Sequence, residues 1–125
     1  MTVLVVGLNA PENPRYLVPT PEAVLGLIDE VGRPEIRFQL DVYHAARGGF
    51  DPLRVIRENG PRIGHVQVAD HPGRHEPGTG SLDFEAILTA LRDAGYHGAI
   101  GLEFLPATPD VPDFSFLPMF RRLAA

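Results

Sequence analysis

Four short runs of apolar residues recur along the chain and predict four β-strands. The runs cover residues 3–8, 36–43, 63–69 and 99–105. Segments with the apolar spacing of amphipathic helices separate them, so that a strand and a helix alternate about every 30 residues. This alternation is typical of successive βαβ units, whose strands form a parallel sheet. The pattern therefore predicts an α/β fold with parallel βα repeats.

The predicted helices have recognisable ends. Three of them follow a residue that favours the N-cap position and stop before a glycine, which readily adopts the left-handed conformation that ends helices. These pairs are Thr20 and Gly32, Asp51 and Gly60, and Asp83 and Gly95. A fourth, weaker helix is expected within residues 114–123, where Pro118 limits its regularity. We expect residues 1–125 to form one domain, with residues 106–125 as a C-terminal tail or helix.

The second predicted strand has one apolar and one polar face. Ile36, Phe38, Leu40 and Val42 alternate with Arg37, Gln39 and Asp41. Strands of a parallel sheet that is covered on both faces usually read as continuous apolar runs, so the alternation needs a cause. Two causes remain open on this pattern alone. The polar face either meets water or lines the interior of a barrel near its active-site mouth.

Composition excludes several classes of function. The 125 residues contain no cysteine, which rules out disulfides, thiol nucleophiles and thiolate metal sites. The net charge is -5 and the 11 basic residues form no long run, which argues against partners such as nucleic acid or an anionic membrane. No apolar run approaches the roughly 18 residues of a transmembrane helix. We expect a cytoplasmic protein that binds a small molecule or a protein partner.

Oxygen-bearing side chains lie at the carboxyl ends of three predicted strands. Asp41 ends one, Gln67 shares a strand face with His65, and Glu103 stands in an otherwise apolar strand. Ligands of parallel α/β folds bind at this edge, and carboxylate and amide oxygens suit Mg²⁺ or Mn²⁺. Each residue taken alone also has an explanation without a ligand. Asp41 could form a turn or cap a helix, and Gln67 could be an ordinary hydrogen-bonded residue. Glu103 is the hardest to explain without a function, because an unpaired charge in a buried strand is costly.

The segment 70–80, DHPGRHEPGTG, is the other feature dense in polar residues. It either presents Arg74 to a carboxylate, which a guanidinium binds through two hydrogen bonds, or forms a long surface turn without a ligand. Its Gly78-Thr79-Gly80 run is too short to indicate a phosphate-binding loop.

Four strings together resemble one known family. They are LNAPENPRYLV (residues 8–18), FQLDVYH (38–44), RIGHVQVADHPGRHEPGTGSLDF (62–84) and AIGLEF (99–104). They resemble hydroxypyruvate isomerase and its relatives in the xylose isomerase-like (β/α)₈ TIM barrel superfamily, which includes the ketose 3-epimerases. The resemblance spans residues 2–105 and implies half of such a barrel, equivalent to strands five to eight. A full barrel takes about 250 residues, roughly twice this length.

The resemblance also implies a site. It assigns Asp41, Gln67 and Glu103 as ligands of a divalent metal, Mg²⁺ or Mn²⁺, with Glu103 also catalytic. It assigns His44, Arg74 and Glu12 to a small hydroxy-carbonyl substrate. Relatives read Glu-Pro before Leu-Asn, whereas Val6-Gly7 stand here. That glutamate is a family metal ligand and one of two catalytic carboxylates, so metal binding is expected to be weak.

The implied activity is the isomerisation of hydroxypyruvate to tartronate semialdehyde through a metal-stabilised enediolate, impaired in this chain by Val6. The alternative is a non-catalytic half-barrel, truncated or degenerate, that keeps a weak metal or ligand site. Four βα units cannot close a barrel, and their open edges favour pairing. We therefore expect a homo-oligomer, in which two copies supply eight strands, or assembly with a complementary N-terminal half-barrel.

Overall fold

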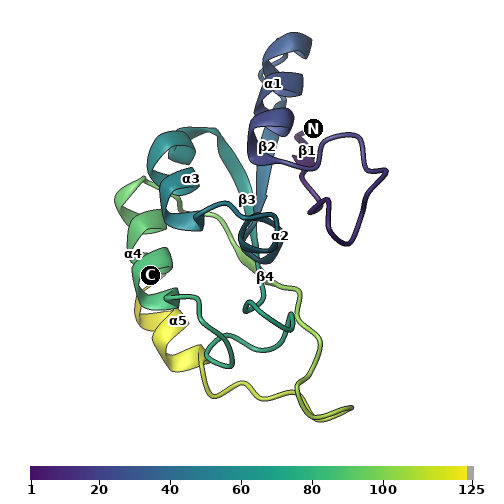
Figure 1. Cartoon of the computed structure of the whole chain (residues 1–125). Helices are drawn as coiled ribbons and strands as arrows, with labels where there is room; N and C mark the ends of the chain where they lie inside the picture. The colour runs from purple at the N-terminus through teal and green to yellow at the C-terminus, as the bar shows by residue number, and fades with distance from the viewer. Residues whose placement is uncertain (124–125) are drawn as a thin grey trace.

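The computed structural model describes residues 1–123 and shows one parallel sheet of four strands in the order β1-β2-β3-β4. The elements, in chain order, are β1 (Val3–Val6), α1 (Pro21–Val31), β2 (Ile36–Asp41), α2 (Val42–Arg47), α3 (Pro52–Asn59), the 3₁₀ turn η1 (Gly60–Arg62), β3 (Ile63–Val68), α4 (Phe84–Asp93), β4 (Ile100–Leu102) and α5 (Leu117–Leu123) (Figure 1). The predicted α/β fold with parallel βα repeats is confirmed.

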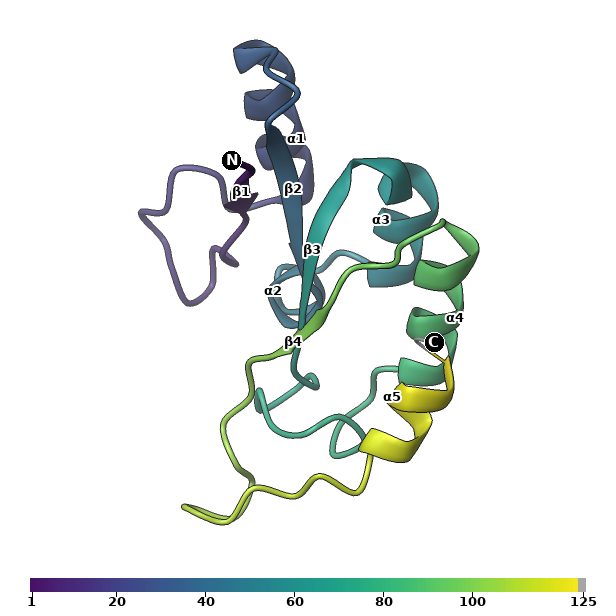
Figure 2. The same cartoon turned by 180° about the vertical axis from the view of Figure 1, so that it is seen from behind.

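The core lies on one face of this sheet. Phe38 and Leu40 of β2 and Val66 and Val68 of β3 are buried in the same cluster as apolar side chains of the helices. The helical members are Val24, Leu25 and Ile28 of α1, Val42 and Ala45 of α2, Val55 and Ile56 of α3, Phe84, Ile87, Leu88 and Leu91 of α4, and Phe120 of α5. Figure 1 and Figure 2 show α3 and α4 side by side along the sheet. One sheet face is thus covered by helices.

The other sheet face is polar and lacks such a cover. Gln39 of β2 is aligned with His65 of β3, and Asp41 with Gln67, so these side chains share one face. Arg37, Gln39, His65 and Gln67 are all partly exposed. The alternation along β2 therefore arises because this chain packs helices against only one side of a parallel sheet.

All four strands end earlier than predicted, and two of these differences bear on the site. The strand predicted over 36–43 stops at Asp41, because the Asp41 side chain accepts a hydrogen bond from the His44 backbone N–H and starts α2. His44 therefore lies in a helix and not in a turn. The strand predicted over 99–105 keeps only Ile100–Leu102, where it pairs with β3 alone.

The helix ends agree better with the sequence. Thr20, Asp51 and Asp83 cap α1, α3 and α4 through their side chains, and Gly32 ends α1 with a φ of 66°. Gly60 is different: it keeps right-handed helical angles and continues into η1. The fourth helix begins at Leu117, later than expected, within the predicted C-terminal segment 106–125. Residues 124 and 125 of that segment lie outside the described part.

β1 and β4 form the two edges of the sheet. Aliphatic side chains remain exposed along both, with Val3 at 43% and Leu4 at 38% on β1 and Leu102 at 40% on β4. Edge strands also leave backbone N–H and C=O groups unpaired, which makes them templates for pairing with another chain. None of the described helices is long and apolar enough to cross a membrane.

Substitution of two glycines, Gly60 and Gly26, tests how tightly the helices pack. A Cβ built on Gly60 would lie 2.4 Å from the Ala94 Cβ, whereas one on Gly26, at an exposed position inside α1, meets no atom within 4 Å. Gly60→Ala should lower the free energy of unfolding by about 1–3 kcal/mol through overpacking. Gly26→Ala should raise it by about 0.5–1 kcal/mol. Urea unfolding of both variants measures these changes, and a loss for Gly26→Ala would contradict the packing described for α1.

Candidate functional site

The carboxyl edge of the sheet brings three predicted site residues onto neighbouring strands. Asp41, at the end of β2, is aligned with Gln67 of β3, and Gln67 with Gly101 of β4. Glu103 follows β4, and its backbone N–H donates to the Val68 carbonyl at 3.0 Å. Because all four strands are parallel, these side chains meet at one edge, where βα folds bind their ligands.

Asp41 is buried, with 5% of its surface exposed. Its Oδ1 accepts a hydrogen bond from the His44 N–H at 2.9 Å, so the interpretation of Asp41 as a helix cap is correct. Burial raises the pKa of Asp41 to about 7, and the Glu103 carboxyl beside it acts in the same direction. Asp41 is therefore both a cap and one member of a pair of neighbouring carboxyl groups.

The Gln67 side chain is held by a second amide. The Gln39 Nε2 donates to Gln67 Oε1, which keeps that oxygen at the polar face of the sheet. An amide oxygen has two lone pairs, so one remains available for a further ligand. Sequence reasoning did not single out Gln39, although its place on the polar face of the second strand was the available signal.

Glu103 is more exposed than the sequence predicts. The expectation that it stands in a buried strand is wrong, because β4 ends at Leu102 and 45% of the Glu103 side chain is exposed. The only strand beside β4 in the described residues is β3, so nothing covers the other edge. The nearest cation is Arg74, whose Nη2 lies 3.7 Å from Glu103 Oε1.

Arg74 belongs to the predicted loop, and its position is fixed on several sides. Its guanidinium stacks over the Tyr43 ring at 5.2 Å, and its backbone carbonyl accepts the Leu105 N–H at 2.8 Å. Its φ of 60° is an unusual value for a residue other than glycine. Arg74 thus faces a carboxylate of the protein itself, that of Glu103. Its role in binding a ligand carboxylate stays a prediction.

Two buried carboxylates that the sequence analysis missed shape this loop. Asp70 is fully buried and accepts hydrogen bonds from the backbone N–H groups of His71, Gly78, Gly80 and Leu82. Glu76 is also buried and accepts the N–H groups of Ala107 and Asp113, which ties the loop to the C-terminal segment. The signal for Asp70 was its place directly after a buried strand and before a glycine-rich segment.

His44 and Glu12 come together around a residue that the sequence analysis also missed. Asn9 is fully buried, and its backbone N and Nδ2 lie 3.2 Å and 2.7 Å from His44 Nδ1. Its Nδ2 also donates to Glu12 Oε2 at 2.8 Å. Glu12 Oε1 accepts the Tyr43 hydroxyl at 2.6 Å and lies 3.6 Å from Arg47 Nε. The signal for Asn9 was a polar residue just after the first strand.

These contacts set the charges of the two groups. The hydrogen bonds from Tyr43 and Asn9 lower the pKa of Glu12, so it is a carboxylate at neutral pH. Burial lowers the pKa of His44, with the Arg74 charge acting in the same direction, so the neutral imidazole prevails at pH 7. The role of both residues in substrate binding stays a prediction.

Val6 lies on the same polar face. It is aligned with Gln39 at the end of β1, so a side chain at this position belongs to the row that contains the candidate ligands. Its hydrocarbon side chain supplies no oxygen to a metal and no acid or base to a reaction.

Asp41, Gln67 and Glu103 offer the type of ligand atom that a hard divalent cation prefers. Within residues 1–123 no three His, Asp or Glu side chains form a group that would hold a metal ion, so Asp41 and Glu103 would need the Gln67 amide as third ligand. All three supply oxygen, the atom that Mg²⁺ and Mn²⁺ prefer. Burial and the neighbouring Glu103 raise the pKa of Asp41, so its ionised form is unfavourable. A cation bound between the two carboxyl groups would stabilise that ionised form.

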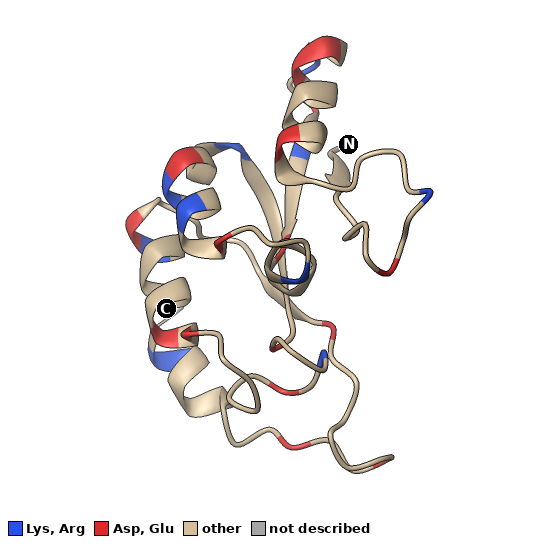
Figure 3. Cartoon of the chain, in the orientation of Figure 1, with Lys and Arg blue, Asp and Glu red and all other residues tan. Residues whose placement is uncertain are grey.

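Charges on the surface are mixed in sign. Figure 3 shows arginines and acidic residues side by side on the helices, and several pairs are in ionic contact, such as Arg54 with Glu58 and Arg62 with Asp29. Nucleic-acid-binding surfaces instead concentrate Lys and Arg on one face. The expectation that the partner is not nucleic acid stays a prediction.

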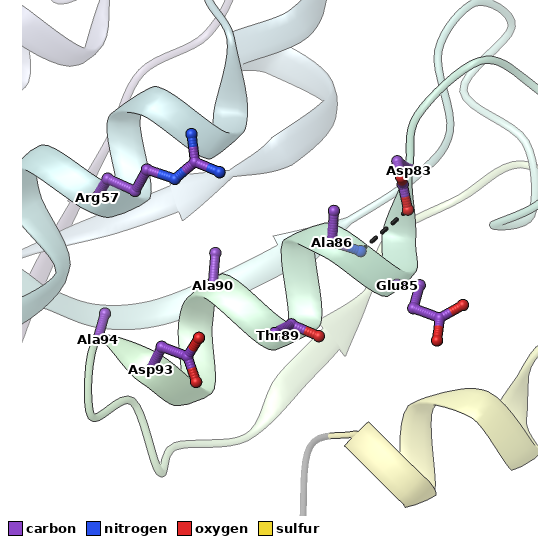
Figure 4. Close-up of a pocket in the computed structure, with 8 residues that line it drawn as sticks. All are labelled: Arg57, Asp83, Glu85, Ala86, Thr89, Ala90, Asp93 and Ala94. Atoms are coloured by element: carbon purple, nitrogen blue, oxygen red, sulfur yellow. Dashed lines mark hydrogen bonds between the residues drawn. The ribbon is translucent and has the colours of Figure 1, made fainter.

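Hollows in the surface show how open the candidate site is. Near Asp41 and His44 a pocket of only about 10 Å³ is present. A larger groove of about 610 Å³ lies between α3 and α4, where Figure 4 shows Arg57 opposite the Ala86, Ala90 and Ala94 row of α4. Small-molecule sites usually enclose about 300–1,000 Å³. The carboxyl edge described here is thus one wall of a site rather than a closed pocket.

Comparisons with known proteins point to one family. The family described as xylose isomerase-like TIM barrel matches residues 8–114. A Streptomyces coelicolor protein provisionally named hydroxypyruvate isomerase is 42% identical over 98% of this chain, and the hydroxypyruvate isomerase of Escherichia coli is 29% identical over 95%. The crystal structure of a Brucella melitensis protein described as AP endonuclease, family 2, is 35% identical over 98% of this chain, with a TM-score of 0.84.

The chain spans about half the length of these relatives. It covers 46% of the S. coelicolor protein, of the E. coli enzyme and of the B. melitensis chain. The parallel four-stranded sheet and this coverage agree with the sequence expectation of half a TIM barrel.

The raised pKa of Asp41 predicts how stability depends on pH. The folded value of about 7 lies above the ordinary value of 3.8, so the stability that the neutral carboxyl supplies is lost as the pH rises through about 7. Asp41→Asn keeps a capping oxygen but removes the charge. Without divalent cations, it should raise the free energy of unfolding more at pH 8 than at pH 5, by at most about 3 kcal/mol, because the folded pKa lies about two units above pH 5.

Urea unfolding at the two pH values measures this difference. Asp51→Asn is the matched control, because Asp51 is an exposed cap of α3. It should show a smaller change between the two pH values. An equal effect of Asp41→Asn at both would contradict the electrostatic cost assigned to Asp41.

Proposed function

Because this chain belongs to the xylose isomerase-like TIM barrel family, we propose that it carries most of the active site of a sugar or hydroxy-acid isomerase of the hydroxypyruvate isomerase type. One observation carries this proposal: Asp41, Gln67 and Glu103 meet at the carboxyl edge of the sheet, with Arg74 3.7 Å from Glu103. The names of the E. coli and S. coelicolor relatives agree with it.

The reaction moves a proton between two adjacent carbons of a hydroxy-carbonyl compound. A base removes the proton from the carbon that bears the hydroxyl group, and the electron pair left behind makes an enediolate. Return of a proton to the neighbouring carbon, with transfer of the hydroxyl proton to the other oxygen, completes the exchange. The site must therefore hold two oxygens of the substrate and place a carboxylate beside the carbons.

Glu103 is the carboxylate for the proton transfer. It is accessible, with 45% of its side chain exposed, and the Arg74 guanidinium fixes its direction. Arg74 is itself held over Tyr43. Arg74 and His44 supply hydrogen-bond donors for substrate oxygens, and Glu12 accepts a hydrogen bond from a substrate hydroxyl or acts through its neighbours.

A divalent cation, Mg²⁺ or Mn²⁺, would be held by Asp41, Gln67 and Glu103, where it would supply positive charge to stabilise negative charge on the substrate oxygens. A cation there also explains why a carboxyl group as buried as Asp41 is placed beside a second one. With three ligands, binding is expected to be weak.

Val6 limits the activity of this chain. Two carboxylates on opposite sides of the substrate handle the proton most effectively, and Val6 leaves Glu103 without that partner. Loss of a positioned acid or base typically costs about 10²–10⁴ in rate. This observation favours a second candidate function, a non-catalytic half-barrel that binds a metal or a hydroxy-carbonyl ligand weakly.

The four described strands form one wall of the site. A TIM barrel needs eight strands, and this chain supplies four with two open edges that expose Val3, Leu4 and Leu102. We propose that a second four-stranded unit closes the barrel, either another copy of this chain or a complementary N-terminal half. The small pocket at Asp41 agrees with a site that one unit leaves open.

Interconversion of hydroxypyruvate and tartronate semialdehyde tests the activity. With Mn²⁺, the chain alone should show little or no turnover, and Val6→Glu should restore some of it. Addition of the half of the S. coelicolor relative that this chain does not match should raise turnover further. Glu103→Gln in the Val6→Glu background should abolish it. Robust turnover of the unmodified chain that survives Glu103→Gln would contradict the role of Glu103.

Light scattering tests the assembly. Self-association should give the mass of two copies, and Leu102→Lys should weaken it by placing a charge on the β4 edge. Val31→Lys is the matched control, because Val31 is equally exposed but ends α1, away from both edges. A mass of one copy for a well-folded chain would rule out the homodimer and leave the complementary half as the partner. A dimer that Leu102→Lys does not weaken would place the contact elsewhere.

A further inference from the structure

The Asn9 side chain has an orientation that its neighbours determine. The Glu12 backbone N–H donates to Asn9 Oδ1 at 2.9 Å, so the atom in this position must be the amide oxygen. The other amide atom is therefore the nitrogen. It donates one hydrogen to Glu12 Oε2 at 2.8 Å, which leaves its second hydrogen for His44.

His44 receives hydrogen bonds at one ring nitrogen from two N–H groups. Asn9 Nδ2 lies 2.7 Å and the Asn9 backbone N 3.2 Å from His44 Nδ1. Both groups are donors only, so Nδ1 must accept and cannot itself carry a hydrogen. In the neutral imidazole the hydrogen then belongs to Nε2.

We propose that Asn9 is a positioning residue that holds His44 in the Nε2–H form, so that the imidazole meets the substrate as a hydrogen-bond donor. The tautomer follows from the contacts of Asn9 alone, and its use in substrate binding rests on the proposed function. Within residues 1–123, the hydrogen bonds of the His44 ring involve Nδ1, and Nε2 has no protein partner.

Glu12 holds the Asn9 side chain in this orientation. Its Oε2 accepts from Asn9, while its Oε1 is taken by the Tyr43 hydroxyl at 2.6 Å and the Arg47 guanidinium at 3.6 Å. Both oxygens thus contact protein groups, and Glu12 orients Asn9.

The arrangement restricts the chemical class of the ligand. Arg74 also carries donors only, and its guanidinium acts on the His44 ring through its charge. A group bound by both side chains must therefore present acceptor oxygens, as a carbonyl, a hydroxyl oxygen or a carboxylate does. An ammonium group is excluded from this position.

Nuclear magnetic resonance of the full ¹⁵N-labelled chain, without substrate or metal, tests the tautomer. Long-range ¹H–¹⁵N correlations at about pH 8, above the ordinary pKa of histidine, show which ring nitrogen carries the hydrogen. The chain has five histidines, and loss of one signal set in His44→Gln assigns His44. We expect a protonated Nε2 and an unprotonated Nδ1. A hydrogen on Nδ1 would overturn the proposal.

Asn9→Asp tests the cause. It replaces the donor with an acceptor, so the hydrogen of His44 should shift from Nε2 towards Nδ1. Asn13→Asp is the matched control, because the Asn13 side chain bonds the Asn9 carbonyl in the same loop without a bond to His44. It should leave the His44 signals in the Nε2–H form. An unchanged tautomer in a folded Asn9→Asp variant would overturn the role of Asn9.

A milder variant keeps the test decisive if Asn9→Asp does not fold. Asn9→Ala removes Nδ2 and retains the backbone N–H, so the fraction of Nε2–H should fall without complete reversal. No change in that fraction would also overturn the proposal. These spectra need no substrate, so the tautomer of His44 is measured whether or not the chain is an isomerase. An Nδ1–H tautomer would refute the role of Asn9 even if the chain were an active isomerase.

Discussion

A parallel sheet that is covered by helices on one face only is the constraint on which the structure depends. Phe38, Leu40, Val66 and Val68 join the helices in one core, and the alternate residues of the same strands form a polar face. Parallel sheets usually bury both faces, so the polar face is stable only if it is solvated, occupied by a ligand or enclosed by further strands. The candidate site and the open edges both follow from this arrangement.

Buried carboxylates that accept backbone N–H groups organise the edge of that face. Asp41 starts α2, Asp70 gathers four N–H groups of its loop, and Glu76 ties the loop to the C-terminal segment. These side-chain oxygens accept backbone N–H groups that have no partner in a strand or helix, so each of the three residues holds its segment in place. Arg74 and His44 are therefore held in place by the folding of loops as much as by the strands.

The two ends of the sheet contribute unequally to the proposed chemistry. β2, β3 and the segment after β4 supply Asp41, Gln67 and Glu103, whereas β1 supplies Val6. The loop after β1 contributes instead through Asn9, which hydrogen-bonds His44, and through Glu12, which hydrogen-bonds Asn9. The polar contacts of the site therefore come from β2, β3, the segment after β4 and the loop after β1, whereas β1 itself contributes an apolar side chain.

The sequence by itself determined the elements and the residue types of the site. Apolar spacing and capping residues located the four strands and the helices α1, α3 and α4. The strand-end rule selected Asp41, Gln67 and Glu103. Both signals are local. Tertiary structure decided what depends on distant neighbours. Glu103 is exposed because no described strand lies beyond β4. The Asp41 side chain caps α2, so the strand predicted to continue there ends. Asn9 contacts His44, which lies 35 residues further along the chain. Hydrogen bonds over such separations leave no periodic pattern in the sequence, which is why only the folded chain shows them.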